Sequence, residues 1–192
     1  RSGAGSTDRR RRSSPVGCAI YTRRRDQFTP MTDSATDVSS IANPITVVGE
    51  RTLRLDAETV EAFDAETRTV EVVCATGHRY TAEWTGISIG DLCEAVDASP
   101  ETTHVVVESL DGYRIAIPIL DGIAGVVAVT KDGRPVGETN PYPNRFVAPD
   151  VEGARDVKGV SRVEFHALAA DEDPEDLEQV EPDDDRFESD RD

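Results

Sequence analysis

Short runs of β-branched residues, separated by turn signals, constrain the fold of this chain more than any other feature. The runs have the length and composition of strands. The pairs Asp111-Gly112 and Asp132-Gly133 each stand between two such runs, which predicts two hairpin turns. The strand–helix–strand rhythm of a parallel sheet is absent, and no internal repeat is visible. The sequence therefore predicts an α+β fold with mixed or antiparallel sheets and a few short helices.

The expected elements follow from the same pattern. One short helix is expected over residues 57–63, capped by Asp56. Another begins after Ser88, where Ile89, Leu92, Cys93 and Val96 form an apolar face at helical spacing. Strands are expected over residues 45–48, 52–55, 69–74, 104–108, 113–117, 126–130, 134–136, 145–148 and 160–166.

Charge divides the 192 residues into three parts. Residues 1–40 are expected to be a disordered leader, in which 1–30 have a net charge of +6 and Met31, the only methionine, is the expected translation start. An export signal around Arg23 is the weaker alternative, because polar residues follow it. Residues 41–170 are the expected folded domain. Residues 171–192 hold 13 acids and two arginines, which predicts an acidic disordered tail, either solvating or used for interaction.

The overall composition excludes some classes of function. A net charge of −17 argues against a nucleic-acid-binding surface, and the chain has no apolar run long enough to span a membrane. Only Lys131 and Lys158 are lysines, and an acidic, lysine-poor domain is typical of a halophilic protein. Three cysteines are too few for a disulfide framework, which favours a reduced, cytoplasmic protein.

A few residues are candidates for chemistry on their own. Cys74 ends an expected strand just before Gly77 and Arg79, so it is either a ligand or nucleophile or a small buried hydrophobe. Tyr113 follows the first Asp-Gly turn, and it is either a phenol placed over a pocket or a half-buried aromatic residue after a turn. The cations Arg145, Arg155 and Lys158 either hold a phosphate or pair with surface acids. The histidines lack the spacing of a zinc site, and nucleotide-binding motifs are absent.

Four segments in order carry a family resemblance. They are V-E-V-V-C-A-T-G-H-R-Y-T-A-E-W-T-G-I-S-I-G-D-L-C, L-D-G-Y-R-I-A-I-P, A-V-T-K-D-G-R-P-V and R-F-V-A-P-D-V-E-G-A-R-D-V-K-G-V-S-R-V-E. Together they resemble the molybdopterin-binding domain of the sulfite oxidase family of oxidoreductases, over about residues 45–168. The resemblance implies a β-rich sulfite-oxidase-type fold.

The resemblance also implies roles for individual residues. Cys74 matches the thiolate that ligates molybdenum, and a soft thiolate suits that metal. Arg79 matches an arginine that faces an oxyanion substrate, and Tyr113 matches a tyrosine near the metal. Arg155 and Lys158 match the loop around the pterin and its phosphate. Arg145 matches an arginine of the same cofactor-binding region, where it supports that loop.

The implied activity is that of a molybdenum–molybdopterin oxidoreductase. It would transfer an oxygen atom to or from a small oxyanion or sulfoxide, with an external electron carrier and with no haem, flavin, zinc or nucleotide. Two departures leave an alternative open, a non-catalytic member acting as a binding or assembly module. No upstream Arg-x-His motif precedes Ile45, and Gly159 stands where the family commonly has tryptophan. A thiol redox protein using Cys74 alone is a third, weaker hypothesis.

Overall fold

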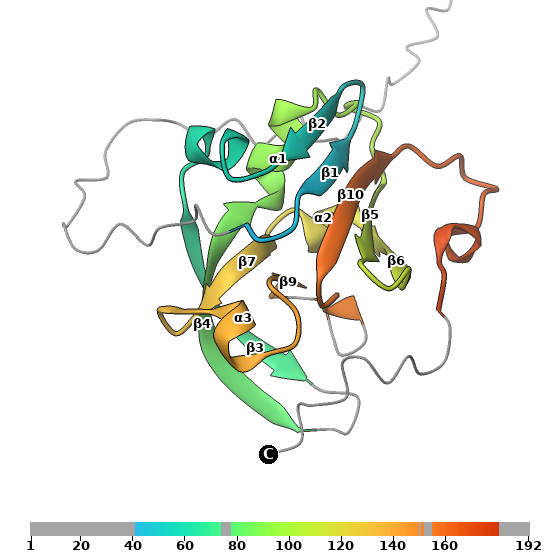
Figure 1. Cartoon of the computed structure of the whole chain (residues 1–192). Helices are drawn as coiled ribbons and strands as arrows, with labels where there is room; N and C mark the ends of the chain where they lie inside the picture. Colours follow the sequence, from blue (N-terminus) through green and yellow to red (C-terminus); the bar gives the residue numbers. More distant parts are fainter. Residues whose placement is uncertain (1–40, 74–77, 150, 152–154, 181–192) are drawn as a thin grey trace, which may run out of the picture.

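Two sheets make up the core of the computed structural model, which describes residues 41–73, 78–149, 151 and 155–180 (Figure 1). All strand pairs are antiparallel except β1 with β10, so the α+β class with mixed sheets is confirmed. The first sheet has the order β2-β1-β10-β5-β6, and the second has the order β3-β4-β7-β8 with β9 pairing β7. The strands are β1 (Ile45–Val48), β2 (Thr52–Leu55), β3 (Glu66–Val73), β4 (Arg79–Ser88), β5 (His104–Ser109), β6 (Arg114–Pro118), β7 (Val126–Lys131), β8 (Arg134–Pro135), β9 (Arg145–Val147) and β10 (Val160–His166).

The helices within the described residues are short. They are α1 (Ile89–Ala95), α2 (Ile119–Gly122) and α3 (Val136–Thr139), with two 3₁₀ helices, η2 (Thr59–Ala62) and η4 (Pro174–Leu177). Ser88 caps α1 as predicted, since its hydroxyl accepts the Asp91 N–H at 3.0 Å. The helix predicted over 57–63 forms only as η2, and the single-turn helices α2 and α3 are too short to show a period. None of the described helices has the length and apolarity needed to cross a membrane.

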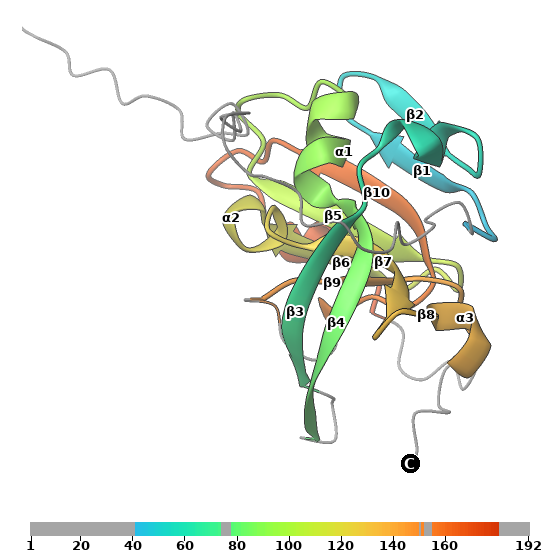
Figure 2. The same cartoon turned by 90° about the vertical axis from the view of Figure 1, so that its left-hand side faces the viewer.

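Strand β4 is absent from the elements predicted from the sequence. It pairs with β3 along its length, and the resulting ribbon extends away from the other strands in Figure 2. Its pairing with β7 shifts register between Thr85 and Gly86. The register skips Val129, so the extra residue lies on β7 and the alternation along β4 itself is intact. The sequence signal of β4 is weak because glycine is a poor strand former and because Trp84 to Ser88 are all buried, which removes the polar–apolar pattern.

On either side of the shift in register between Thr85 and Gly86, β4 contributes to two hydrophobic cores, because side chains alternate along a strand. Beyond it, Ile87 joins the main core with Val127, Phe146, the apolar face of α1 and the inner face of the first sheet. Before it, Trp84 joins a smaller core on the other face of the second sheet. That core contains Val70, Val72, Ala82, Trp84, Val126, Ala128, Val136, Tyr142 and Val147.

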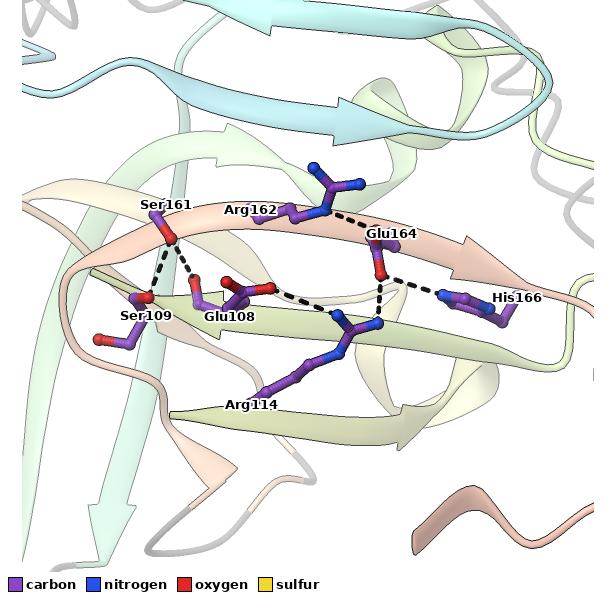
Figure 3. A network of polar contacts seen from close by, with 7 residues as sticks. All are labelled: Glu108, Ser109, Arg114, Ser161, Arg162, Glu164 and His166. Atoms are coloured by element: carbon purple, nitrogen blue, oxygen red, sulfur yellow. Dashed lines mark hydrogen bonds and ion pairs between the residues drawn. The ribbon is translucent and has the colours of Figure 1, made fainter. Parts of the chain in front are cut away.

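A polar network crosses the outer face of the first sheet (Figure 3). Glu164 on β10 lies at its centre and accepts hydrogen bonds from Arg114, from Arg162 at 2.5 Å and from His166 at 3.2 Å. Arg114 also reaches Glu108 at 3.4 Å, which links β10, β5 and β6. Burial alone would raise the pKa of Glu164, but the hydrogen bonds from Arg162 and His166 and the charge of Arg114 outweigh it and lower the pKa.

The start of the acidic tail is paired with the first sheet. Gln179 exchanges two backbone hydrogen bonds with Arg114 on the edge strand β6, at 3.0 and 2.9 Å. The Glu178 carboxylate accepts the Ala116 N–H at 3.2 Å. These residues differ from the predicted disorder over 171–192, because an edge strand offers backbone groups that a neighbouring segment can satisfy. Residues 1–40 and 181–192 lie outside the described part of the chain.

Gly86→Ala tests the close approach of β4 and β7. A Cβ at this position would lie 1.9 Å from the Val127 carbonyl oxygen and 2.6 Å from the Ala128 Cα. We expect the free energy of unfolding, measured by urea denaturation, to fall by about 2 kcal/mol or more. The control is Gly137→Ala, where the nearest atom is 3.5 Å away and little change is expected. Equal stability of the two variants would contradict the proposed contact.

Glu164→Gln tests the polar network. The pKa of Glu164 is lowered in the folded chain, so its carboxylate stabilises the fold at neutral pH, and this contribution is lost as the pH falls through the folded-state pKa. We expect the variant to lose about 1–3 kcal/mol at pH 7 in urea denaturation, with a smaller difference from the parent in acid. Glu108→Gln, which removes a single contact to Arg114, is the control and should lose less. A pH-independent loss in Glu164→Gln would contradict the assigned role.

Candidate functional site

The predicted molybdenum ligand, Cys74, lies outside the described residues, which stop at Val73 and resume at His78. The two strands that flank it are described and pair in register, with Val73 opposite Arg79. Both flanks of Cys74 are therefore held side by side at the end of the β3–β4 ribbon. Its role as a ligand stays a prediction.

Arg79 begins β4 and lies on the surface. Its guanidinium pairs with the Glu71 carboxylate at 3.3 Å, and the two side chains are 58% and 55% exposed. An exposed pair of this kind contributes little to stability, so a stronger anion can compete for the guanidinium. The position agrees with the predicted substrate-facing role but does not test it.

A group of cations and aromatic rings lies on the outer face of the second sheet, and we call it the aromatic–cation cluster. The Lys131 ammonium lies 4.2 Å from the centre of the Tyr80 ring and 5.4 Å from that of Trp84. The Arg145 guanidinium lies 5.7 Å from the Trp84 ring centre and donates to the Tyr80 hydroxyl at 3.2 Å. The Lys158 ammonium lies 5.6 Å from the Tyr142 ring centre. The members are Tyr80, Trp84, Lys131, Tyr142, Arg145 and Lys158.

Strand register assembles this cluster. Tyr80 and Trp84 are four residues apart on β4 and share a face, since side chains alternate along a strand. Trp84 is the cross-strand partner of Lys131 on β7, and a backbone bridge joins Arg145 to Lys158. Segments far apart in the sequence therefore place three cations next to aromatic faces, an arrangement that is favourable for each cation.

Asp156 is the acidic neighbour of this cluster. It is 4% exposed, and its carboxylate lies 3.9 Å from the Arg145 guanidinium. Burial raises the pKa of Asp156 to about 7, despite the opposing charge of Arg145 and a backbone hydrogen bond from Ala148. Around neutral pH this carboxyl is only partly ionised, so it neutralises only part of the positive charge beside it.

Tyr113 and Arg155 form a second group beside β6. The Arg155 guanidinium donates to the Ala116 carbonyl at 2.6 Å and to the Glu178 carboxylate at 3.2 Å. Burial raises the pKa of the Tyr113 hydroxyl, and the charge of Glu178 raises it further, so this phenol stays protonated at neutral pH. The segment 155–158 spans both groups, because Arg155 reaches β6 whereas Asp156 reaches Arg145.

The structure thus divides the residues predicted for the site. Arg145 and Lys158 come together in the aromatic–cation cluster, whereas Arg155 is paired with the start of the acidic tail. Sequence reasoning missed Tyr80, Lys131 and Asp156 as neighbours of these cations. The scarcity of lysine was the available signal, because both lysines of the chain and its only tryptophan belong to the cluster.

Cys93 occupies the predicted apolar face of α1 and is 1% exposed. It is disulfide-bonded in the structure, so the expectation of reduced cysteines is wrong at this position. The physical reason is that a buried thiol position remains compatible with a disulfide when another cysteine approaches it.

Comparison with known proteins shows the family of this chain. A model described as the oxidoreductase molybdopterin binding domain matches residues 37–172. The chain belongs to this family. It is 38% identical over 100 residues to the mitochondrial sulfite oxidase of Macaca fascicularis, covering 46% of this chain and 18% of that protein. The resemblance to the sulfite oxidase family seen in the sequence is confirmed.

A solved structure shares the fold. The crystal structure of the sulfane dehydrogenase SoxCD from Paracoccus pantotrophus superposes with a TM-score of 0.60 at 17% identity, covering 87% of this chain and 51% of that chain. This family member therefore spans about half the length of the SoxCD chain and less than a fifth of the length of the sulfite oxidase.

Asp156→Asn tests the electrostatics of the cluster. The folded state holds a proton on Asp156 up to a pKa of about 7, against an ordinary value of 3.8, so the parent loses stability as the pH rises between these values. The Asn variant lacks this loss. In urea denaturation we expect its stability relative to the parent to improve from about pH 5 to about pH 8.

The matched control is Asp97→Asn, which changes a carboxylate that is 62% exposed and should show no such trend. A constant difference between parent and Asp156→Asn across this pH range would show that Asp156 ionises as an ordinary carboxyl.

Proposed function

We propose that this chain binds a molybdenum–pterin cofactor and acts as the catalytic domain of an oxidoreductase. The observation that supports this most is the aromatic–cation cluster, in which buried Arg145 and its bridge partner Lys158 concentrate positive charge in a chain with a net charge of −17. An anionic ligand with a flat ring system suits this site, since the partly exposed Lys158 can attract its phosphate and the partly exposed Tyr80 can pack against its rings, while buried Trp84 and Tyr142 support them.

The residues present fit this cofactor. Arg145 and Lys158 would bind its phosphate, and Cys74 would supply a thiolate to the metal. When bound, the cofactor supplies two-electron oxygen-atom transfer chemistry, and the protein supplies binding and orientation. Asp156 would position Arg145 from behind, across a separation of 3.9 Å, while adding only part of a negative charge at neutral pH.

Arg79 and Tyr113 would act on the substrate. The Arg79 guanidinium can leave its exposed partner Glu71 and pair with an oxyanion. The raised pKa of Tyr113 keeps its hydroxyl protonated, so it would donate a hydrogen bond to an oxygen of the substrate. A small oxyanion or sulfoxide is the proposed substrate class, and the names of the two relatives, sulfite oxidase and sulfane dehydrogenase, agree with a sulfur compound. An external carrier would exchange the electrons.

One observation favours a second candidate, a non-catalytic binding module with this fold. Arg155, predicted to hold the cofactor, instead donates to the Ala116 carbonyl and to Glu178. A cofactor phosphate would have to displace Glu178 from Arg155. If the tail holds Arg155 permanently, the site lacks one of its predicted cations.

Metal content separates the two candidates. The full chain is expressed in a host that makes the pterin cofactor and is purified in high salt, and molybdenum is measured per chain. We expect about one molybdenum per chain, lost in Cys74→Ser because the thiolate ligand is gone. Cys18→Ser is the control and should retain the metal. Parent and variants are all compared under reducing conditions, because Cys93 is disulfide-bonded in the structure and a cysteine variant could otherwise act through that bond. A folded parent without molybdenum would overturn the catalytic proposal and favour the binding module.

A further inference from the structure

Lys131 has no assigned role in the proposed site, yet it lies at the centre of the aromatic–cation cluster. Its ammonium and the Arg145 guanidinium share the same two rings, Tyr80 and Trp84. In the described part of the chain Lys131 contacts these rings rather than a carboxylate. Two cations on one pair of rings repel each other, and an anion between or beside them removes that repulsion.

The position of Lys131 is built into the backbone. Asp132 and Gly133 both have positive φ, 49° and 75°, and form the tight turn between β7 and β8. Asp132 is tied to β4 twice, because its N–H donates to the Glu83 carbonyl at 2.7 Å and its carboxylate accepts the Glu83 N–H at 2.9 Å. These bonds fix the backbone of Lys131 opposite that of Trp84, from where its side chain reaches both rings.

A second observation concerns the tryptophan itself. The Trp84 indole N–H is buried and has no hydrogen-bond acceptor among the described residues, although the residue is only 1% exposed. A buried donor without an acceptor is unusual and unfavourable. It adds a positive end to the same region that Lys131 and Arg145 occupy, which raises the local attraction for an anion.

From these contacts we propose that Lys131 is a binding residue for a tetrahedral oxyanion of the phosphate class, held at the aromatic–cation cluster together with Arg145. This inference rests on the proposed function and adds to it a binding residue, Lys131, to which the family resemblance assigned no role. The oxyanion is either the phosphate of the cofactor or a free oxyanion such as the substrate, and the two sources share the chemistry that Lys131 recognises.

The chain's only tryptophan reports on this site directly. Full-length chain, expressed without the cofactor, is titrated with inorganic phosphate at low ionic strength while Trp84 fluorescence is recorded. We expect a saturable change in the parent and about tenfold weaker binding in Lys131→Gln, because a charge-assisted hydrogen bond is lost. Circular dichroism checks that each variant is folded.

Arg134→Gln is the matched control. It removes one positive charge from the same hairpin, three residues from Lys131, at a position that is exposed. We expect it to bind phosphate like the parent. Equal weakening in both variants would show a general effect of charge, and unchanged binding in Lys131→Gln or no saturable change in the parent would also overturn the inference.

Repeating the titration on cofactor-loaded chain distinguishes the two sources of the anion. Loss of phosphate binding after loading supports the cofactor phosphate as the ligand of Lys131, and retained binding supports a free oxyanion. Molybdenum is measured in the same samples, so the two proposals fail separately. If Lys131→Gln retains molybdenum and binds phosphate as the parent does, only this inference is overturned. If phosphate binding depends on Lys131 but the chain never takes up molybdenum, only the proposed function is overturned.

Discussion

The close approach of β4 and β7 at Gly86 is the contact on which both cores and the candidate site depend. No side chain fits there, because the Val127 carbonyl occupies the space that a Cβ would take. Ile87 faces the main core and Trp84 the smaller one, since residues three apart on a strand lie on opposite faces. The same pairing sets Lys131 opposite Trp84. Packing and site geometry are thus consequences of one local backbone arrangement.

Electrostatics gives this fold a second organising feature. The chain is strongly acidic, yet three cations gather on aromatic rings at one face of the second sheet. Asp156 is the carboxyl beside them, and its burial keeps it partly protonated around neutral pH. In the first sheet the opposite arrangement holds, since Glu164 is surrounded by Arg114, Arg162 and His166 and stays ionised. Burial decides the first case and direct hydrogen bonding decides the second.

Much of the fold could be predicted from the sequence because its signals are local. The strands at 45–48 and 52–55, the Ser88 cap and the hairpin at Asp132-Gly133 all appear where short-range patterns place them. Strand β4 could not be predicted, because glycine is a poor strand former and its residues from Trp84 to Ser88 are all buried, so no alternation of polar and apolar residues marks that half. Gly159 could not be explained from the sequence either. Its φ of 63° lies in the left-handed region, which favours glycine, but no pattern in the sequence predicts that conformation.

The sequence by itself determined the α+β class, the family and the pool of candidate residues, because periodicity, turn pairs and ordered motifs are properties of neighbouring residues. Only the tertiary structure decided which of these candidate residues lie together. It joined Arg145 to Lys158, brought Lys131 to the same rings and paired Arg155 with Glu178. These groupings depend on strand register and on a tail that returns to an edge strand. Such contacts link residues far apart in the chain, and their energies are set by burial and distance in space.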